Sequence, residues 1–448
     1  MTARFTVDRS YRRPNRGRVV VGGSPLRLFT LSERGLLIVD AVEAGQVMPS
    51  GHATLTDRLL DAGAIHPVVE LEPCDSRLLT VIVPSRGDLP LFHARQCRAI
   101  AVDDGSTPAL AVRDMELVRL DSNVGPGGAR NAGLAMVTTP YVAFVDADVV
   151  VDEDDLLRLA AHLVADPTVA LVAPRVGAVT DAGALARFEQ RHSPLDMGRE
   201  PARIAPTTRV SYVPAAVLVC RTDAVREVGG FAPDLRYGED VDLVWRLVAA
   251  GRRCRYEPQI IALHRTRSTL AAWLRQRYCY GTSAAVLAER HPGALAPVRM
   301  SPWSVATWLP VLAGVPLVGA LVGAGTAVAL TRTLRTIPAS EALRLAGMGN
   351  LYAGRLLSAT LTRAWWPITL VLAMMSSRVR RMLVLAVVVP AALDWRAERP
   401  PLDPVRYVAL RLLDDVAYGA GVWAGALRAR SFAAITPSLE SWPPRSRT

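Results

Sequence analysis

Apolar residues in the middle of the chain fall into short runs that alternate with longer amphipathic stretches. Four runs between residues 76 and 290 are typical of buried strands: 78–83, 99–102, 116–120 and 141–145. Each ends in polar or glycine-rich sequence. Strands that alternate with helical stretches predict an α/β fold with a parallel sheet. Because ligands of such folds bind beyond the carboxyl ends of the strands, we expect the functional residues there.

The last third of the chain consists mainly of apolar blocks. Residues 300–331 contain no charged side chain, and a helix of that length can cross the roughly 30 Å hydrocarbon core of a bilayer. The blocks at 364–377 and 382–393 are each too short to cross. Joining them would bury the arginines at 378–381 in the membrane, at a large cost in free energy. A spanning helix, helices on the membrane surface and a buried soluble core therefore all stay open.

A further amphipathic helix is predicted close to the C-terminus. Its apolar face would be formed by Val408, Leu412, Val416, Trp423 and Leu427. We expect Arg411, Asp414 and Asp415 to lie off that face.

The first 72 residues have the pattern of a small α+β or winged-helix module. Ser32 begins one predicted helix and Gly63 ends another. One interpretation is a structural cap on the next domain. The other is a peptide-docking module, because the segment resembles the small recognition domains of peptide-modifying pathways, which bind a precursor peptide by adding a strand.

Composition and charge exclude several classes of function. All 52 basic residues are arginine, and the absence of lysine excludes Schiff-base chemistry and the lysine of a P-loop. The net charge is +11, and arginine flanks apolar runs, which favours an anionic membrane surface over nucleic acid. Five scattered cysteines have no CxxC spacing, so we expect neither a disulfide framework nor a zinc site. No apolar signal segment is evident at the N-terminus.

Two acids end the second strand run, in AVDDGST. Asp103 and Asp104 follow apolar residues directly, and a Gly-Ser turn comes next. Carboxylates here can accept hydrogen bonds from a uracil N–H or from ribose hydroxyls. The motif alone is weak, because Asp-Gly is a common turn sequence.

A glycine-rich stretch, NVGPGGARNAG, covers residues 123–133. Its glycines allow the backbone to approach a ligand closely. Arg130, in the first turns of the helix that follows, can either reach a phosphate or anchor the loop. The stretch is not a GxGxxG motif after the first strand, so a Rossmann dinucleotide site is disfavoured.

The strand run at 141–145 ends in Asp146-Ala147-Asp148. A period of two places both carboxylates on one side of an extended chain, where they can bind one hard divalent cation. That cation would neutralise a departing diphosphate. An isolated D-x-D is usually a solvated turn, but its place after a buried strand and behind the two preceding motifs favours the metal site.

Three acids begin the amphipathic helix of YGEDVDLVWRL, residues 237–247. Acids in the first turn of a helix interact favourably with its dipole, so a solvated helix end is the simplest interpretation. Asp242 stands four residues before Arg246, which suits an ion pair along the helix. Glu239 and Asp240 have no such partner in the local sequence.

The set of motifs resembles that of a known family. VPSRG, VDDGS, NVGPGGARNAG, FVDADV, GGFAPD and GEDVDL stand in the order and approximate spacing found in inverting family-2 glycosyltransferases with the GT-A fold, and they cover residues 78–290. The resemblance implies a nucleotide-sugar donor and a Mn²⁺ or Mg²⁺ ion. One spacing departs from the family, which usually has a helix where this chain has only the short connection between residues 84 and 99.

The resemblance also implies roles for individual residues. Asp103 and Asp104 would hold the nucleoside, and Asp146 and Asp148 would hold the metal and the ribose-diphosphate. Asp240 would be the general base that deprotonates the acceptor hydroxyl, an effect of about 10²–10⁴-fold, with Glu239 bound to acceptor hydroxyls. His264 would be a further metal ligand, unless it is a satisfied core histidine. The other expected donor-binding residues are Pro84, Asn123, Gly127, Arg130, Asn131 and Ala147.

A narrower resemblance rests on the peptide-recognition-like front, on LRQRYCYGTSAAVLAERHPGALAP at 274–297 and on LDDVAYGAGVWAGALRARS at 413–431. With these segments the chain resembles the glycosyltransferases of the mycofactocin system, a bacterial pathway to a peptide-derived redox cofactor. This resemblance implies β-linked glucose transferred from UDP-glucose to premycofactocin, a peptide-derived acceptor, at the cytoplasmic face of the cell membrane. A precursor peptide would bind the N-terminal module. Two alternatives stay open: a family-2 transferase acting on a lipid-linked or cell-wall glycan, and a non-catalytic binding protein.

These observations predict three parts. Residues 1–72 form a winged-helix-like module, residues 76–298 a GT-A domain of α/β class, and residues 299–448 an apolar helical region associated with a membrane.

Overall fold

The computed structural model describes residues 4–48, 53–69, 72–179 and 183–440. Its contacts divide the chain into two compact units. The sheet unit comprises residues 1–12, 20–182 and 189–266, and the helical unit comprises residues 13–19, 183–188 and 267–448. The predicted division into three parts stays a prediction.

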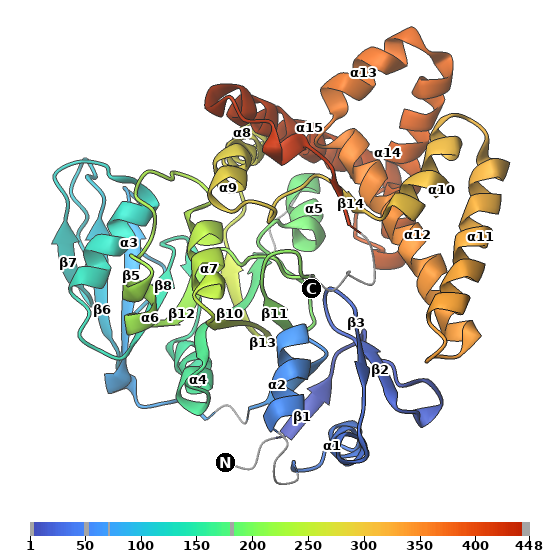
Figure 1. Cartoon of the computed structure of the whole chain (residues 1–448). Helices are drawn as coiled ribbons and strands as arrows, with labels where there is room; N and C mark the ends of the chain where they lie inside the picture. Colours follow the sequence, from blue (N-terminus) through green and yellow to red (C-terminus); the bar gives the residue numbers. More distant parts are fainter. Residues whose placement is uncertain (1–3, 49–52, 70–71, 180–182, 441–448) are drawn as a thin grey trace. The chain divides into compact units, whose positions relative to one another are not determined.

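A nine-stranded mixed sheet forms the centre of the sheet unit (Figure 1). Its order is β11-β13-β10-β12-β8-β5-β6-β7, and β9 pairs with β13. The strands are β5 (Leu79–Ser85), β6 (Arg98–Asp103), β7 (Glu116–Arg119), β8 (Tyr141–Val145), β9 (Val149–Val150), β10 (Val169–Ala178), β11 (Ala202–Ile204), β12 (Val217–Arg221) and β13 (Arg253–His264). The four strands predicted from the apolar runs are β5 to β8, and they pair in parallel as expected. Antiparallel β12 and β11 make the whole sheet mixed.

Helices cover both faces of this sheet, which explains why its central strands are apolar on both sides. Val81 and Ala143 share a buried core with Leu156 of α4 (Glu153–Ala165). On the other face, Gly133 of α3 (Gly125–Ala135) lies against Ile82. Two further helices of this unit are α6 (Thr222–Glu227) and α7 (Glu239–Ala249).

The connection from β5 to β6 contains no helix. Residues 86–97 form bends and irregular chain, yet the two strands are parallel neighbours, with Ile82 opposite Ile100. The departure in spacing noted in the sequence therefore corresponds to a real loss of the crossover helix. A parallel connection needs about a dozen residues, and residues 86–97 provide only about that number.

The N-terminal module, residues 4–68, belongs to the sheet unit except for residues 13–19, which belong to the helical unit. The module has its own small core, which includes Phe5, Val39 and Leu59. Its elements are β1 (Arg4–Val7), β2 (Val19–Gly22), β3 (Arg27–Thr30), α1 (Glu33–Glu43), α2 (Ala53–Ala62) and β4 (Ile65–Val68). Both predicted helix boundaries are confirmed. Ser32 caps α1 by accepting from the Gly35 amide at 3.2 Å, and Gly63 follows α2 with a φ of +69°.

The helical unit contains most of the remaining helices (Figure 1). They are α8 (Leu270–Thr282), α9 (Ala284–Arg290), α10 (Pro302–Leu312), α11 (Pro316–Thr333), α12 (Ala339–Thr362), α13 (Trp366–Met375), α14 (Ser377–Glu398) and α15 (Pro404–Ala429). The short strands β14 (Arg299–Met300) and β15 (Ser438–Leu439) pair beside them. Helix α5 (Ala184–His192) is shared between the two units.

The amphipathic helix predicted near the C-terminus is α15, and it packs against its neighbours mainly through small residues. Leu412 and Leu427 are exposed, whereas Tyr407, Val422 and Ala426 are buried. Val408, Val416 and Trp423 of the predicted apolar face are half-buried, and glycines make the closest contact with α8. A Cβ at Gly421 would lie 2.0 Å from the carbonyl oxygen of Tyr278, so α15 and α8 can approach only where side chains are absent.

The charged residues expected off that face instead take part in ion pairs between helices. Asp414 and Asp415 both accept from Arg363, at 3.2 and 3.0 Å, and Asp414 also binds Arg277. Arg411 pairs with Asp394 of α14. These polar pairs therefore hold the helices of this unit together.

The uncharged run at 300–331 is not one continuous helix. It divides at residues 313–315 into α10 and α11, which pack as an antiparallel hairpin: Gly319 of α11 lies against Thr307 and Val311 of α10. Within the part of the chain that the structure describes, α11 is the one helix long and apolar enough to cross a membrane, and only 6% of that span is buried. Helices α12 and α13 pass the same test as a pair, but with an 83° bend between them.

Three of the five cysteines, Cys97, Cys220 and Cys254, are buried in the sheet unit. Cys74 of that unit and Cys279 of the helical unit are partly exposed.

Candidate active site

The predicted motifs come together at the carboxyl ends of the parallel strands. Asp103 ends β6, Asp146 follows β8, and Glu239 begins α7. Some of these side chains are buried and bind only other parts of the protein, so they stabilise the fold. Others are partly exposed and can contact a substrate.

Asp103 is fully buried and holds the loop that follows it. Its carboxylate accepts from the amides of Ser106 and Leu110 at 2.9 and 3.0 Å and from Arg119 at 3.1 Å. Burial opposes the charge, but these hydrogen bonds and the guanidinium outweigh it and lower the pKa of Asp103. The carboxylate is therefore ionised and already fully engaged by the protein.

Asp104 caps the N-terminus of α3. One oxygen accepts from the Val124 amide at 2.7 Å, and the other accepts from the Asn123 side chain at 2.6 Å and the Gly125 amide at 3.1 Å. Gly105 allows this approach, because a Cβ there would lie 2.8 Å from the Ser122 carbonyl carbon and its φ is +69°. The nucleoside role expected for this acidic pair stays a prediction, and the structure adds a clear structural role.

Arg130 forms the central contact of the site. Its side chain is only 3% exposed, donates to Asp146 at 2.5 Å and to Glu239 at 2.8 Å, and lies over the Phe231 ring. Although burial disfavours its charge, the two carboxylates raise the pKa of Arg130. Of the two roles open to this residue, the structure favours the anchor: one guanidinium ties the D-x-D motif to the Glu-Asp pair.

The two carboxylates of the D-x-D motif have different partners. Asp146 binds Arg130, whereas Asp148 Oδ2 lies 3.2 Å from His264 Nε2. This proximity follows from the sheet, because His264 pairs with Val149 of β9. Between them, Ala147 accepts from the Leu91 amide through its carbonyl oxygen at 2.9 Å.

Asp148 and His264 fit a divalent cation that is shared with a substrate. Among residues 4–48, 53–69, 72–179 and 183–440, no three acidic, His or Cys side chains converge on one point. Magnesium-type sites commonly use one or two protein ligands and take the rest from substrate phosphates and water. This pair is of that kind, and its metal role stays a prediction.

The three acids of α7 have three different surroundings. Asp242 is buried and pairs with Arg246, with Oδ2–Nη2 at 2.7 Å, as the i,i+4 spacing predicted. Glu239 is buried against Arg130. Asp240 is partly exposed and accepts from the Ala215 amide at 3.2 Å and from the Val241 amide at 2.8 Å.

The pKa values of Glu239 and Asp240 are both higher than those of free carboxyl groups. Burial raises the pKa of Glu239 to about 7, with the Asp240 charge adding to the effect and Arg130 opposing it. Burial also raises the pKa of Asp240, and Asp146 adds to it, while the Val241 and Ala215 amides and Arg130 oppose it. Burial is the main cause of both shifts, and the neighbouring carboxylates add to it.

The remaining predicted donor-binding residues hold neighbouring chain segments. Asn131 binds both the N–H and the C=O of Phe231, at 2.9 and 2.8 Å. Asn123 also accepts from Arg236 at 2.9 Å. Gly127 is needed for packing, because a Cβ there would lie 3.1 Å from the Ala232 oxygen. Pro84 stands opposite Val102 between β5 and β6.

Sequence patterns did not identify Ala215 or Phe231 as part of the site. Ala215 contributes its backbone N–H to Asp240, and Phe231 contributes its ring to Arg130. Any residue except proline can donate a backbone N–H, so the residue type at position 215 does not reveal this contact. The GGFAPD motif did mark the neighbourhood of Phe231, but not its contact.

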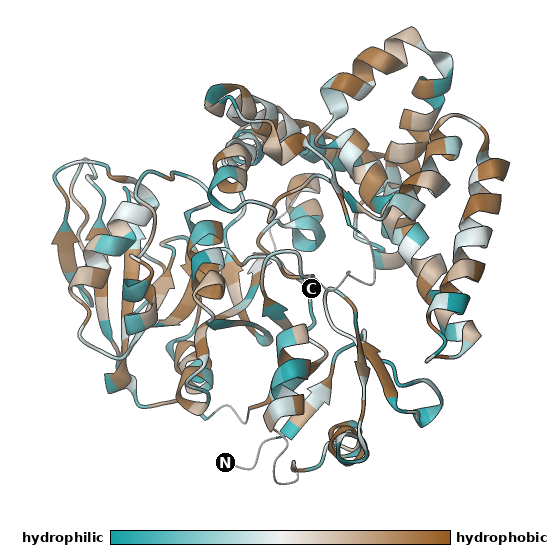
Figure 2. Cartoon of the chain, viewed as in Figure 1, coloured by the Kyte–Doolittle hydropathy of each residue, from teal (hydrophilic) through white to brown (hydrophobic). Residues whose placement is uncertain are grey.

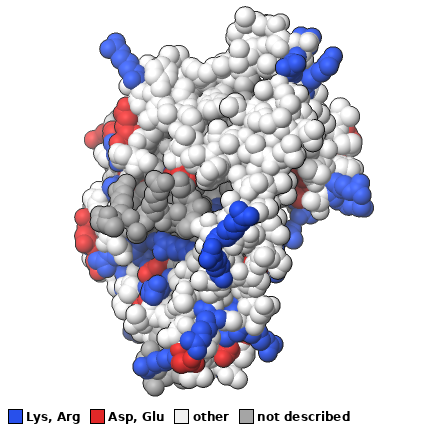
Figure 3. All heavy atoms as spheres, turned by 45° about the vertical axis from the view of Figure 1, so that its right-hand side comes forward, with Lys and Arg blue, Asp and Glu red and all other residues white. Residues whose placement is uncertain are grey.

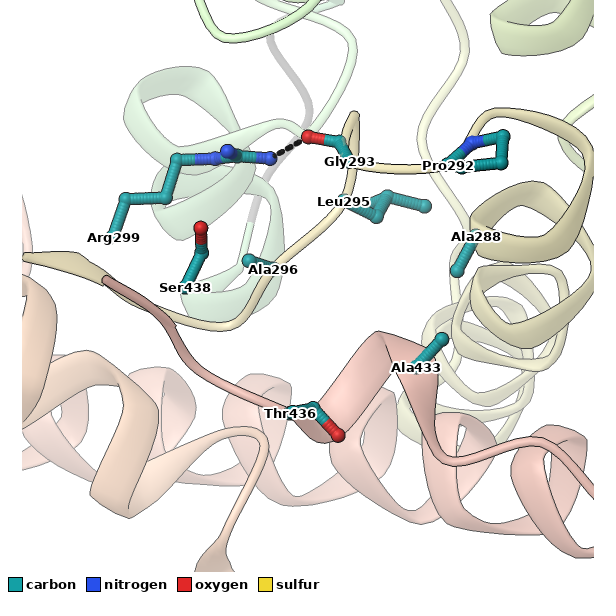
Figure 4. Close-up of a pocket in the computed structure, with 9 residues that line it drawn as sticks. All are labelled: Ala288, Pro292, Gly293, Leu295, Ala296, Arg299, Ala433, Thr436 and Ser438. Carbon is teal, nitrogen blue, oxygen red and sulfur yellow. Dashed lines mark hydrogen bonds between the residues drawn. The ribbon is translucent and has the colours of Figure 1, made fainter. Parts of the chain in front are cut away.

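A cavity of about 320 Å³ lies in the helical unit and has no connection with these residues (Figure 4). It is lined by Ala288, Pro292, Gly293, Leu295, Ala296, Arg299, Ala433, Thr436 and Ser438. Arg299 donates to the Gly293 carbonyl and pairs with Glu440. The side chains that line it are mostly small and offer no catalytic pair.

Comparison with known proteins identifies the family of this site. The family model described as glycosyl transferase family 2 matches residues 93–224. A pre-mycofactocin glycosyltransferase from Mycobacterium tuberculosis is 37% identical over 97% of this chain and 97% of its own. The succinoglycan biosynthesis protein ExoO of Rhizobium meliloti is 31% identical over 36% of this chain and 49% of its own.

Two solved structures are similar at lower identity. Staphylococcus aureus TarS in complex with UDP-GlcNAc is 18% identical, with a TM-score of 0.36 over 47% of this chain and 66% of that one. The mannosyltransferase PcManGT from Pyrobaculum calidifontis, in complex with GDP-Man and Mn²⁺, is 20% identical, with a TM-score of 0.34 over 63% of this chain and 90% of that one.

Proposed function

The chain belongs to the family-2 glycosyltransferases that include the pre-mycofactocin enzyme, and from this premise we propose that it transfers a hexose to premycofactocin with inversion. Similarity that extends over 97% of both chains supports the acceptor. UDP-glucose is the proposed donor, as the motif resemblance implies, and the product would be β-linked.

One observation carries the proposal: Arg130 holds Asp146 and Glu239 through a single guanidinium. This contact supports a single site that contains both the D-x-D motif and the Glu-Asp pair. A diphosphate beside Asp148 and an acceptor hydroxyl beside Asp240 would then lie on either side of one sugar ring, as inversion requires.

The reaction follows from these positions. The acceptor hydroxyl oxygen bonds to the anomeric carbon while Asp240 takes its proton, and the bond from that carbon to the diphosphate oxygen breaks. The diphosphate leaves with the bonding electrons. A divalent cation bound at Asp148 and His264 would supply neutralisation of the charge on that diphosphate.

The raised pKa of Asp240 suits a general base. A base works best when its pKa approaches the working pH, and the buried cluster moves this carboxyl in that direction. Arg130 keeps the cluster from becoming too negative, so that Asp240 still ionises.

The test is a transfer assay with a panel of nucleotide sugars and acceptors, in which products are identified by mass. We expect a hexosylated premycofactocin from UDP-glucose, and loss of the product when divalent metal is chelated. Asp240→Asn should lower kcat by about 10²–10⁴-fold with donor affinity unchanged.

Asp242→Asn is the matched control for that substitution. It makes the same charge change on the same helix, but at a residue that pairs with Arg246, so it should lower stability and leave most of the turnover. Normal turnover by Asp240→Asn would exclude Asp240 as the base. Transfer to a lipid-linked glycan and not to premycofactocin would favour the alternative acceptor.

We also propose that the helical unit binds the cytoplasmic face of the bacterial membrane. Large apolar side chains are exposed along α10, α11 and α13, among them Trp303 at 67%, Leu317 at 71% and Met375 at 80%. Figure 2 shows these helices as largely hydrophobic, and Figure 3 shows few charges over the helical unit, with arginines at its margins. An exposed apolar surface of this kind marks an interaction site, and arginine favours anionic lipid.

The structure of the hairpin favours a place at the membrane surface over a full crossing. Helix α10 has 11 residues, about 16 Å at 1.5 Å per residue, which is about half of a hydrocarbon core. Its C-terminal carbonyl, at Ala313, accepts from Arg378 at 2.9 Å. An arginine at the turn between α10 and α11 suits the lipid headgroups.

A further inference from the structure

A short buried stretch connects the N-terminal module to the candidate active site within the sheet unit. We call it the 209–216 segment. Val210, Val213, Ala215 and Ala216 in it are all buried. Tightly packed residues transmit a displacement to their neighbours, because no space is left to absorb it.

At its first residue the segment is bound to the module. The Arg209 amide donates to Ser24 Oγ at 2.6 Å, and the Arg209 guanidinium donates to Asp8 Oδ2 at 3.1 Å. Asp8 is buried and also lies 3.0 Å from His66 Nε2 of β4. Arg209 further donates to the Pro201 carbonyl at 2.7 Å, which fixes its side chain.

Its other residues are bound to the candidate active site. Ser211 accepts from the indole N–H of Trp245, in α7, at 2.7 Å. The Ala215 amide donates to Asp240 at 3.2 Å, and the Ala216 carbonyl accepts from the Asp146 amide at 3.0 Å. One stretch of eight residues therefore contacts both the proposed base and the D-x-D motif.

We propose that Arg209 is a positioning residue, through which the N-terminal module fixes the 209–216 segment and with it Asp240 and Asp146. This inference rests on the proposed function. It assigns the module a part in turnover, in addition to any role in binding a peptide.

The chain provides a matched control in Arg253 of β13. Arg253 also binds the module, with Nε 2.8 Å from Asp61 and Nη2 2.9 Å from Asp57. It lies outside the 209–216 segment, and its other side-chain contacts among the described residues are with Thr168 and Asp166, not with Asp240 or Asp146. Replacing either arginine removes ion pairs to the module. Of the two, Arg209 belongs to the segment that contacts Asp240 and Asp146.

The experiment compares Arg209→Ala, Arg209→Lys and Arg253→Ala in the full chain. We expect Arg209→Ala to lower kcat by about ten- to a hundred-fold, because small misplacements of a catalytic group have effects of that size, with KM for the donor changed by less than about threefold. Arg209→Lys should recover part of the loss, since its ammonium can still pair with Asp8. Arg253→Ala should lower Tm by a similar amount and leave kcat within about twofold.

Amide hydrogen exchange supplies a readout that does not depend on activity. In Arg209→Ala, amides of the 209–216 segment should exchange faster, and in Arg253→Ala they should not. Equal kcat values in the two alanine variants, or unchanged exchange in Arg209→Ala, would overturn the positioning role. A wild-type chain without transferase activity would instead refute the proposed function, and the exchange result would still test the geometry.

Discussion

At the scale of single residues, Arg130 decides how the site is assembled. It is buried and pairs with two carboxylates at 2.5 and 2.8 Å. Its Nε atom makes no hydrogen bond within the part of the chain that the structure describes. Lysine, which this chain does not use, could not form both contacts in the same plane. The guanidinium is thus required by geometry as well as by charge.

Replacing Arg130 should be costly for folding. Arg130→Met leaves Glu239 buried without its cation, and the loss of one member of a buried pair destabilises proteins by about 3–5 kcal/mol. Since Asp146 is about one-third exposed, we expect a value near the lower limit, about 3 kcal/mol. Urea unfolding measures it. The control is Arg98→Met, which removes an arginine that pairs with exposed Glu116. It should lower the free energy of unfolding by less than about 1 kcal/mol. Equal losses of stability in the two variants would show that Arg130 is not central.

The pH dependence of turnover belongs to the same cluster. Asp240 must be deprotonated to act as base, so kcat falls as the pH drops through its pKa. Because burial raises the pKa of Asp240 and raises that of Glu239 to about 7, the acidic limb of kcat should lie above the value of about 3.9 for a free Asp. The two neighbours interact, so the limb reports the pair.

A profile of kcat against pH at saturating substrate gives this limb directly. Glu239→Gln should leave a limb with a single step, because it removes the Glu239 titration, whose pKa is about 7, and keeps that of Asp240. An acidic limb at or below about pH 4 in the wild-type chain would contradict the buried-cluster explanation.

At the scale of elements, strand ends and helix starts were predictable because their signals are local. The runs ending at Val145 and Leu120 gave β8 and β7 almost to the residue. The i,i+4 pair of Asp242 with Arg246 was predictable for the same reason. The partners of Arg130 and the Ala215 amide were not, because they lie far away in the chain and depend on how the elements pack.

Helix α3 shows how one acid can serve an element and a ligand together. Asp104 accepts three hydrogen bonds at the start of α3. Asp104→Ala should destabilise the chain by about 1–2 kcal/mol. If Asp104 also contacts the nucleoside, donor affinity should fall as well, which isothermal titration with UDP measures.

The control for this substitution is a helix cap away from the motifs. Asp152 caps α4 by accepting from the Asp154 amide at 3.0 Å. Asp152→Ala should lower stability by about 1 kcal/mol and leave UDP binding unchanged. Equal UDP affinity in both variants would restrict Asp104 to its structural role.

At the scale of the whole molecule, composition predicted the apolar C-terminal region but not its arrangement. Residues 300–331 carry no charge, yet the chain turns at Gly314, whose φ is +81°. The apolar face of α15 was predictable from its spacing, but its close contact with α8 at Gly421 was not. Glycine allows turns and close contacts that a count of apolar positions does not detect.

Membrane binding can be tested on the intact chain with lipid vesicles. The protein should sediment with vesicles that contain phosphatidylglycerol, and less with phosphatidylcholine alone. The double substitution Leu317→Glu and Leu321→Glu on α11 should weaken binding at least about tenfold, because each buried Leu contributes about 1.5–3 kcal/mol.

Leu37→Glu is the matched control, since Leu37 is equally exposed but lies in the N-terminal module. It should leave vesicle binding unchanged. Equal effects of the α11 and Leu37 substitutions would show that the apolar surface of the helical unit does not meet lipid.

The distribution of thiols has a practical consequence. Cys74 in one unit and Cys279 in the other are the accessible cysteines, while the remaining three are buried. A pair of nitroxide labels can therefore be attached to the natural chain without any substitution. The dipolar coupling between the two labels would show whether donor binding changes the distance between the two units.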